Sequence, residues 1–170
     1  MRFTPAVPER AVTLTPLDEA GLARLLDAAV ADSDPLEVMP PVDGPDGWTS
    51  RRREAFLAFH RKRTLDPATA VERTWVIDVD GVAAGAARLE RHGDDVEAGI
   101  WLGRTRRGRG IGKRVMDLLL DAAKHSGAKR FVASTTTGNH GARGLLTGLG
   151  AAMSVNQDEV HAALSLLESG

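Results

Sequence analysis

The sequence predicts a mixed α/β fold built as a single domain. Segments with strand character alternate with segments of helical periodicity, and a hairpin pattern in the middle of the chain precedes a strand–helix–strand run. Antiparallel strands followed by such a run are typical of a mixed sheet with helices packed on it. The chain has 170 residues, of which 42% are hydrophobic, so one domain spanning residues 1–170 can bury a proper core.

The first segments predict a strand and then a helix. Residues 1–10 are interrupted by proline, and we expect them to be loose. Residues 11–17 alternate between apolar and polar side chains, which predicts a short strand. Apolar side chains from Leu22 to Val30 recur at helical spacing, so a helix should begin near Asp18.

Residues 32–47 predict a long loop, because they are dense in Pro, Gly and Asp. Thr49 or Ser50 should cap a second helix directly after it. Trp48 stands between the loop and this helix, where it would either line an acceptor pocket or anchor the loop to the core.

A hairpin is predicted next, over residues 75–79 and 82–89. The Asp80-Gly81 pair between them suits the type I′ turn that joins two antiparallel strands. Residues 96–102 predict a further strand.

The remaining chain alternates between helix and strand. Apolar positions within residues 111–122 predict a helix, and residues 130–135 predict a strand. Asn139 should cap a short helix that ends at Gly150. Residues 160–166 fit a final strand, although an amphipathic helix fits them almost as well.

The composition excludes several kinds of site. The chain has no cysteine, which removes disulfides, thiolate metal ligands and a catalytic thiol. No histidines and carboxylates have metal-ligand spacing, so we expect no metal. The formal net charge of -1 disfavours general polyanion binding. Without a signal-peptide pattern or an apolar run long enough to span a bilayer, we expect a cytoplasmic protein.

The stretch RTRRGRGIGKR (residues 104–114) combines basic residues with glycines just before a predicted helix. A phosphate-binding loop of the type G-x-x-x-x-G-K-[ST] would need glycine in place of Arg107 and Ser or Thr in place of Arg114. A dinucleotide-binding G-x-G-x-x-G would need glycine at Lys113 or at Val115. Both motifs are therefore excluded.

The same stretch can still form an anion-binding site. Its glycines let successive backbone N–H groups converge, and the start of a helix adds the positive end of its dipole. Arg107, Arg109 and Lys113 can add charge-assisted hydrogen bonds to phosphates. A solvated basic loop is one alternative. A nucleic-acid-binding module is another, although an aromatic content of 4% and the absence of tyrosine disfavour it.

Two motifs make the chain resemble the GCN5-related N-acetyltransferases. The signature Q/R-x-x-G-x-G/A, between a strand and a helix, is met by Arg107, Gly110 and Gly112. The signature N-x-x-A-x-x-L-Y-x-x-x-G-F is met in part, at Asn139, Ala142, Leu145 and Gly150. The similarity covers about residues 96–151, and the W-L-G run before the glycines resembles the branch that includes ribosomal-protein N-terminal acetyltransferases.

The resemblance implies a central mixed, mostly antiparallel sheet of about six or seven strands flanked by about four helices. It also implies acetyl-CoA as co-substrate. The pyrophosphate would lie on the amides of residues 108–113, and the pantetheine arm would pair with the strand edge near Leu102 and Arg104. The thioester would lie near Asn139. The expected cofactor-binding residues are Leu102, Arg104, Arg107, Gly108, Arg109, Gly110, Ile111, Gly112, Lys113 and Asn139.

The chain departs from the family pattern at two positions. The usual tyrosine, often the acid that protonates the departing thiolate, corresponds to Leu146, and the usual phenylalanine corresponds to Ala151. A thiolate whose conjugate acid has a pKa of about 8.5 needs only water or a weak donor near neutral pH. Thr147 and His140 are the neighbours at hand. A catalytically degenerate acetyl-CoA-binding domain with a regulatory role is the alternative.

Without a cysteine nucleophile, direct attack by a primary amine on the thioester is the simplest mechanism. Glu97 is the candidate base, acting directly or through water. The backbone N–H near Leu102 is the candidate oxyanion donor by resemblance to the family. His60 would be packed, solvated or on the acceptor side, and His161 shows nothing beyond ordinary placement. The acceptor stays open between a peptide N-terminus, an aminoglycoside and a small amine, and a homodimer is possible.

Overall fold

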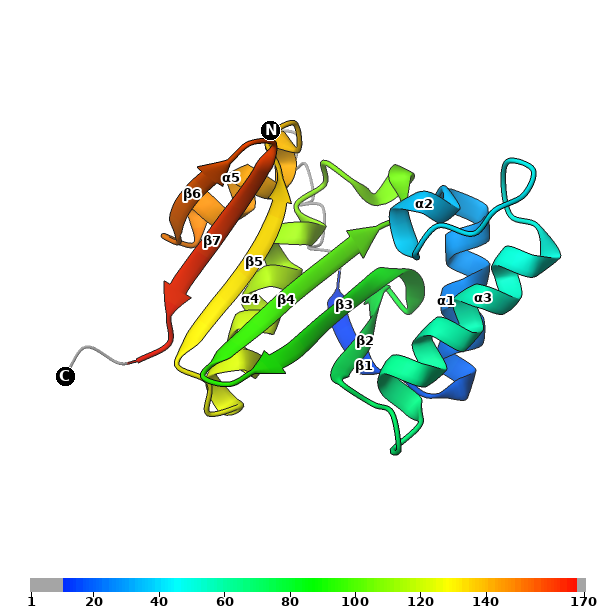
Figure 1. Ribbon diagram of the computed structural model, residues 1–170, viewed down its shortest axis with the longest axis horizontal. Helices are drawn as coiled ribbons and strands as arrows, with labels where there is room; N and C mark the ends of the chain where they lie inside the picture. Colours follow the sequence, from blue (N-terminus) through cyan, green and yellow to red (C-terminus); the bar gives the residue numbers. More distant parts are fainter. Residues whose placement is uncertain (1–10, 168–170) are drawn as a thin grey trace, which may run out of the picture.

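The computed structural model describes residues 11–167, so the loose segment expected at residues 1–10 lies outside the described part. The sheet has seven strands in the order β1-β2-β3-β4-β5-β7-β6 (Figure 1). Its strands are β1 (Val12–Pro16), β2 (Glu72–Val79), β3 (Val82–His92), β4 (Asp95–Leu102), β5 (Arg130–Thr136), β6 (Ala152–Asn156) and β7 (Glu159–Ser165). Its α-helices are α1 (Glu19–Asp32), α2 (Pro35–Val38), α3 (Ser50–His60), α4 (Ile111–His125) and α5 (His140–Gly148).

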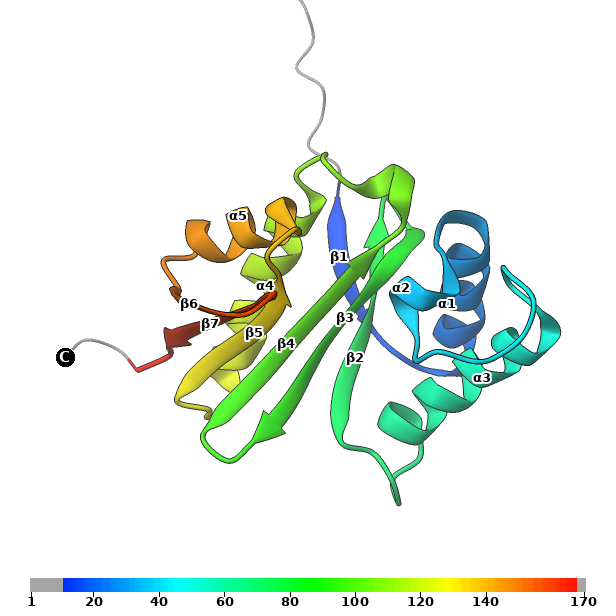
Figure 2. The ribbon, with the colours of Figure 1, turned by 45° about the horizontal axis from the view of Figure 1, so that its top comes forward.

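One strand pair differs from all the others of the sheet. β4 and β5 are parallel, whereas the other neighbouring pairs are antiparallel. They pair only from Asp95 with Arg130 to Glu97 with Val132, and Figure 2 shows them diverging beyond that point. The expected mixed, mostly antiparallel sheet is confirmed. Its only described parallel pair, β4 and β5, separates beyond Glu97 and Val132, and we call this separation the split.

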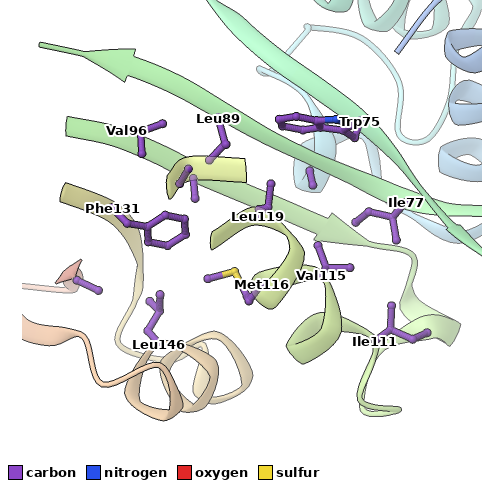
Figure 3. Packing of buried hydrophobic residues seen from close by; sticks show 14 of the residues in the cluster. Trp75, Ile77, Leu89, Val96, Ile111, Val115, Met116, Leu119, Phe131 and Leu146 are labelled. Carbon is purple, nitrogen blue, oxygen red and sulfur yellow. The ribbon is translucent and has the colours of Figure 1, made fainter. Parts of the chain in front are cut away.

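Helices cover both faces of the sheet (Figures 1 and 2). α1, α2 and α3 lie on one face, where Leu22, Phe56 and Val76 belong to one buried cluster. α4 and α5 lie on the other face, where the larger cluster includes Leu119 and Phe131 (Figure 3). Five α-helices are therefore described rather than about four. Among residues 11–167, no helix is long and apolar enough to cross a membrane.

The first half of the chain follows the sequence patterns with one addition. Asp18 caps α1, and Thr49 rather than Ser50 caps α3. The expected loop over residues 32–47 also contains the short helix α2, because Asp34 accepts a hydrogen bond from the N–H of Leu36 and a proline occupies the first helical position. The proline density that predicted an unbroken loop was therefore misleading.

Two side chains hold the rest of that loop. The indole Nε1 of Trp48 donates to the carbonyl of Ser33 at 2.8 Å, and its ring meets the edge of Phe56. Arg52 of α3 donates to several loop carbonyls, among them that of Val42. Trp48 thus anchors the loop to the core, which was one of the two roles expected for it.

The second half differs mainly at its end. Asp80 and Gly81 both have positive φ, 51° and 80°, as the predicted type I′ turn requires. The final segment is the strand β7 and not a helix. Strand β6 was not predicted, because most of its side chains are exposed and it lacks a clear apolar alternation.

Candidate active site

A cavity of about 640 Å³ lies where β4 and β5 separate. Its walls come from β4, from the loop between β4 and α4, from the end of β5 and from the start of α5. The lining residues are Glu37, Ala98, Gly99, Ile100, Trp101, Leu102, Arg107, Gly108, Gly110, Gly112, Lys113, Met116, Ala133, Ser134, Thr135, Asn139, Gly141, Ala142, Leu145 and Leu146.

Two backbone N–H groups of β4 face the cavity. Gly103 N–H donates to the carbonyl of Ala84 on β3, and the carbonyl of Trp101 also points toward β3, at Gly85. Because successive backbone groups of a strand point in opposite directions, the N–H groups of Ile100 and Leu102 point toward β5. The ladder with β5 has ended before that point, so these donors face the cavity.

The glycine-rich loop forms the next wall. Gly108 and Gly110 have φ values of 70° and 81°, the left-handed region that favours glycine. A Cβ built on either would meet no atom within 4 Å, so space lies directly over this backbone. Gly110 precedes the first residue of α4, whose N-terminal amides and dipole add positive potential. These features fit a pyrophosphate group.

Most of the predicted cofactor residues line this cavity. They are Leu102, Arg107, Gly108, Gly110, Gly112, Lys113 and Asn139. Arg104, Arg109 and Ile111 are not among the lining residues. Arg104 begins a 3-10 turn beyond the end of β4 and is not on the strand edge, and the side chain of Ile111 is buried in the core.

Glu37 of α2 lies beside the glycine-rich loop, a contact that the sequence did not predict. Its carboxylate accepts hydrogen bonds from Arg107 and, at 2.6 Å, from Arg104. The Arg107 guanidinium and then that of Arg104 hold the pKa of Glu37 below its ordinary value, against the opposing effect of burial. Arg107 also donates from Nε to the carbonyl of Leu102 at 3.2 Å. The arginine fixed by the motif is therefore already paired.

Glu97 lies at the point where β4 and β5 part, and it does not line the cavity. Arg88 donates to one of its carboxylate oxygens at 2.9 Å. Gly99 makes this possible, since a Cβ there would lie 2.7 Å from Nε of Arg88. Glu97 is about 10 Å along the strand from Ile100, at the usual rise per residue. The next two residues of β4, Ala98 and Gly99, do line the cavity.

The neighbours of Glu97 include other potential metal ligands. Ligand atoms of Glu90, His92 and Glu97 lie within 4.8 Å of one another. The carboxylates are, however, paired with Arg63 and Arg88. These guanidiniums already neutralise the carboxylates, so we assign no metal to the cluster.

His60 is buried, with 4% of its surface exposed. Its ring lies against Phe56 and Phe59, and neither ring nitrogen has a hydrogen-bond partner. Burial, and then the charge of Arg63, lower the pKa of His60 to about 4. His60 is therefore a neutral packed side chain, and it does not line the cavity.

The position of the family's tyrosine contributes no acid. Leu146 is 4% exposed and packs in the core beside Phe131 and Met116 (Figure 3). Asn139 uses its side-chain oxygen to cap α5, where it accepts from the N–H of Ala142 at 3.1 Å.

A further polar pair at the cavity was not anticipated from the sequence. Ser134 of β5 lines the cavity, and its Oγ lies 3.0 Å from Nδ1 of His161 on β7. The two residues are 27 positions apart, so only the pairing of β5 with β7 brings them together.

Residues 38–151 match the model of the acetyltransferase (GNAT) family, and the chain belongs to that family. It is an N-acetyltransferase by this membership, as its two motifs predicted. No curated protein matches the sequence.

Solved structures share the fold. Salmonella typhimurium YncA with acetyl-CoA is 22% identical, with a TM-score of 0.65 over 93% of this chain and 95% of that one. Mycobacterium smegmatis RimJ with CoA-disulfide is 21% identical, with a TM-score of 0.74 over 91% and 81%. RimL, a ribosomal L7/L12 α-N-protein acetyltransferase with CoA, is 17% identical, with a TM-score of 0.68 over 91% and 93%.

Proposed function

We propose that this chain transfers an acetyl group directly from acetyl-CoA to a primary amine. The observation that carries this proposal is the split between β4 and β5 beside the glycine-rich start of α4. One end of this site has the unpaired N–H groups of β4, and the other end has the positive N-terminus of α4. An elongated ligand with a pyrophosphate and an amide-containing arm matches both parts.

Each part of the ligand has assigned residues. The amides of residues 108–113 would hold the pyrophosphate, and Arg107 and Lys113 would add charge-assisted hydrogen bonds. The N–H groups of Ile100 and Leu102 would donate hydrogen bonds to the carbonyl oxygens of the pantetheine arm. The Leu102 N–H would also be the donor that stabilises the oxyanion formed during acyl transfer.

Glu97 remains the proposed base. Its hydrogen bond with Arg88 uses one carboxylate oxygen, the other lies 3.9 Å from Nε2 of His92, and its side chain is 37% exposed. A water between Glu97 and the amine would carry the proton. The acceptor itself stays within the class of primary amines: a peptide N-terminus, an aminoglycoside or a small amine.

A degenerate acetyl-CoA-binding domain is the second candidate, because Leu146 is buried in the core where an acid would be needed. The two candidates differ in turnover and not in ligand binding. A screen of peptides with free N-termini, a polyamine and an aminoglycoside, followed by release of free CoA thiol, separates them.

The assignment of the site is tested by Gly110→Trp. An indole at this position would fill the space over the loop, so CoA binding and turnover should both be lost. Gly127→Trp is the matched control. Gly127 also has positive φ, 78°, with open space around it, and it lies outside the cavity. Full CoA binding in Gly110→Trp would mean that the assigned site is wrong.

A further inference from the structure

A chain of three polar side chains leads from the cavity to the protein surface. Ser134 Oγ lies 3.0 Å from Nδ1 of His161, and Nε2 of His161 lies 3.4 Å from a carboxylate oxygen of Glu159. Ser134 lines the cavity, whereas His161 and Glu159 do not. We propose that Ser134 and His161 form a proton relay that protonates the thiolate leaving during acyl transfer, an inference that rests on the proposed function.

The strand registers place the pair on a defined face of the sheet. Ser134 is directly opposite His161 in the β5–β7 ladder. Two residues earlier on β5, Val132 pairs with Glu97 of β4. Since alternate residues of a strand share a face, Ser134, His161 and Glu97 point to the same side of the sheet. The proposed base and the relay therefore lie on the same face of the sheet, with Glu97 and Ser134 on the two strands that flank the split.

Other cavity-lining groups are less suited to this step. Leu146 has no proton to give, and the side chain of Asn139 is engaged in capping α5. Thr135 alternates to the opposite face of β5. Among the described residues that line the cavity, Ser134 is the one hydroxyl that is hydrogen-bonded to a titratable side chain.

The proton balance of the step is simple. The amine nitrogen forms a bond to the thioester carbon, and the carbon–sulfur bond breaks, so that sulfur leaves as a thiolate. Ser134 gives its hydroxyl proton to this sulfur and takes the proton of Nδ1 of His161. The imidazole regains a proton from solvent, to which 48% of its side chain is exposed. The amine loses its own proton through the separate base.

Polar groups surround the imidazole of His161. Its ring faces Ser134 on β5, Ser154 on β6 and Glu159 on its own strand. When Nε2 faces Glu159 at 3.4 Å, Nδ1 is the ring nitrogen that faces Ser134. Imidazolium ions as a class are stronger acids than thiols by about two pKa units, so proton transfer to the thiolate is downhill.

Hydroxylamine is a suitable nucleophile for the test, because it attacks thioesters and is largely unprotonated near neutral pH. Release of CoA thiol from acetyl-CoA is measured with the wild type and with Ser134→Ala, Ser134→Thr and His161→Gln. We expect kcat to fall about 10- to 100-fold in Ser134→Ala and His161→Gln, at or below the lower limit of typical acid–base effects because a thiolate leaves easily. Ser134→Thr keeps a hydroxyl and should retain most of the activity.

Binding and pH dependence separate a chemical role from a structural one. The Kd for CoA should stay within about twofold in every variant. A relay through an imidazole predicts a fall of wild-type kcat at alkaline pH that His161→Gln lacks. Ser154→Ala is the matched control, because Ser154 faces His161 from the other side and does not line the cavity.

Several outcomes would overturn the relay while leaving the proposed function intact. They are wild-type kcat in Ser134→Ala, an unchanged alkaline decline in His161→Gln, or equal losses in Ser134→Ala and Ser154→Ala. A wild type that binds CoA but releases none above background, with hydroxylamine or any screened amine, would instead overturn the proposed enzyme and the relay together.

Discussion

Glu37 of α2 is hydrogen-bonded to Arg107, the arginine that the family motif assigns to the phosphates. The guanidinium that the proposed ligand would use therefore already donates a hydrogen bond to a carboxylate. Because Arg107 and Arg104 lower the pKa of Glu37, this carboxylate is ionised at neutral pH. The arrangement sets Glu37 and the phosphates in competition for the same partner.

Glu37→Gln should tighten the binding of CoA severalfold, as expected for the loss of one partly exposed ion-pair partner. Isothermal titration at low and at moderate salt measures the change, which should shrink as salt is added. Glu54→Gln removes one exposed charge from α3 and should have no effect. Weaker binding in Glu37→Gln would mean that Glu37 orients Arg107 and does not compete for it.

Glu97→Gln should lower kcat about 10- to 100-fold and leave the KM for acetyl-CoA unchanged, since a base outside the cavity does not contribute to cofactor binding. Steady-state kinetics with the best acceptor of the screen measures both constants. Glu90→Gln is the control, because Glu90 contacts the same Arg88. Equal losses in both variants would assign the effect to the ion-pair cluster and not to proton transfer.

Gly85→Ala should strongly destabilise the protein. A Cβ at Gly85 would lie 2.0 Å from the carbonyl oxygen of Trp101, and backbone atoms cannot move aside as a flexible side chain can. We expect a loss of about 2 kcal/mol or more in the free energy of unfolding, as for other overpacked sites. Denaturant unfolding measures it. Gly138→Ala, where a Cβ would meet nothing within 4 Å, should be tolerated, and a stable Gly85→Ala would contradict the register of β3 and β4.

His60 should make the protein less stable in mild acid. Its pKa of about 4 in the folded state lies below the ordinary 6.5, so the unfolded chain binds the extra proton between these values. Stability therefore falls as the pH drops from about 6.5 to 4, by up to about 3 kcal/mol from this residue.

His60→Phe should remove that part of the pH dependence, because the ring is packed between phenylalanines and makes no hydrogen bond. Unfolding free energies of wild type and variant at pH 7 and pH 4.5 give the difference. His125→Phe, at an exposed position in α4, should keep the wild-type dependence. The prediction is wrong if His60→Phe loses stability in acid as steeply as the wild type.

The elements that the sequence predicted correctly carry their signal locally. α4 shows apolar residues at helical spacing after glycines, and the Asp80-Gly81 turn is set by two residues. The helix α2 was missed because a proline at the first helical position resembles the prolines of a loop. β6 was missed because an exposed edge strand has little apolar alternation.

The functional residues divide in the same way. The glycine-rich loop was identified because its spacing is a local pattern. Glu37 meets Arg107 and Ser134 meets His161 through contacts across 70 and 27 positions of the chain, which no local pattern records. The split between β4 and β5 likewise depends on two strands that a helix separates in the sequence. The residues of either strand alone do not predict it.

The short junction between β4 and β5 gives the proposed ligand a mechanical role. Backbone pairing joins the half of the sheet formed by β1 to β4 to the half formed by β5 to β7 over only three residue pairs. A pantetheine arm bonded to Ile100 and Leu102 would extend the β4 edge and brace the two halves against each other. Ligand binding would then slow amide hydrogen exchange in β4 and β5 and raise the unfolding temperature. The co-substrate would be a temporary strand of the sheet as well as the source of the acetyl group.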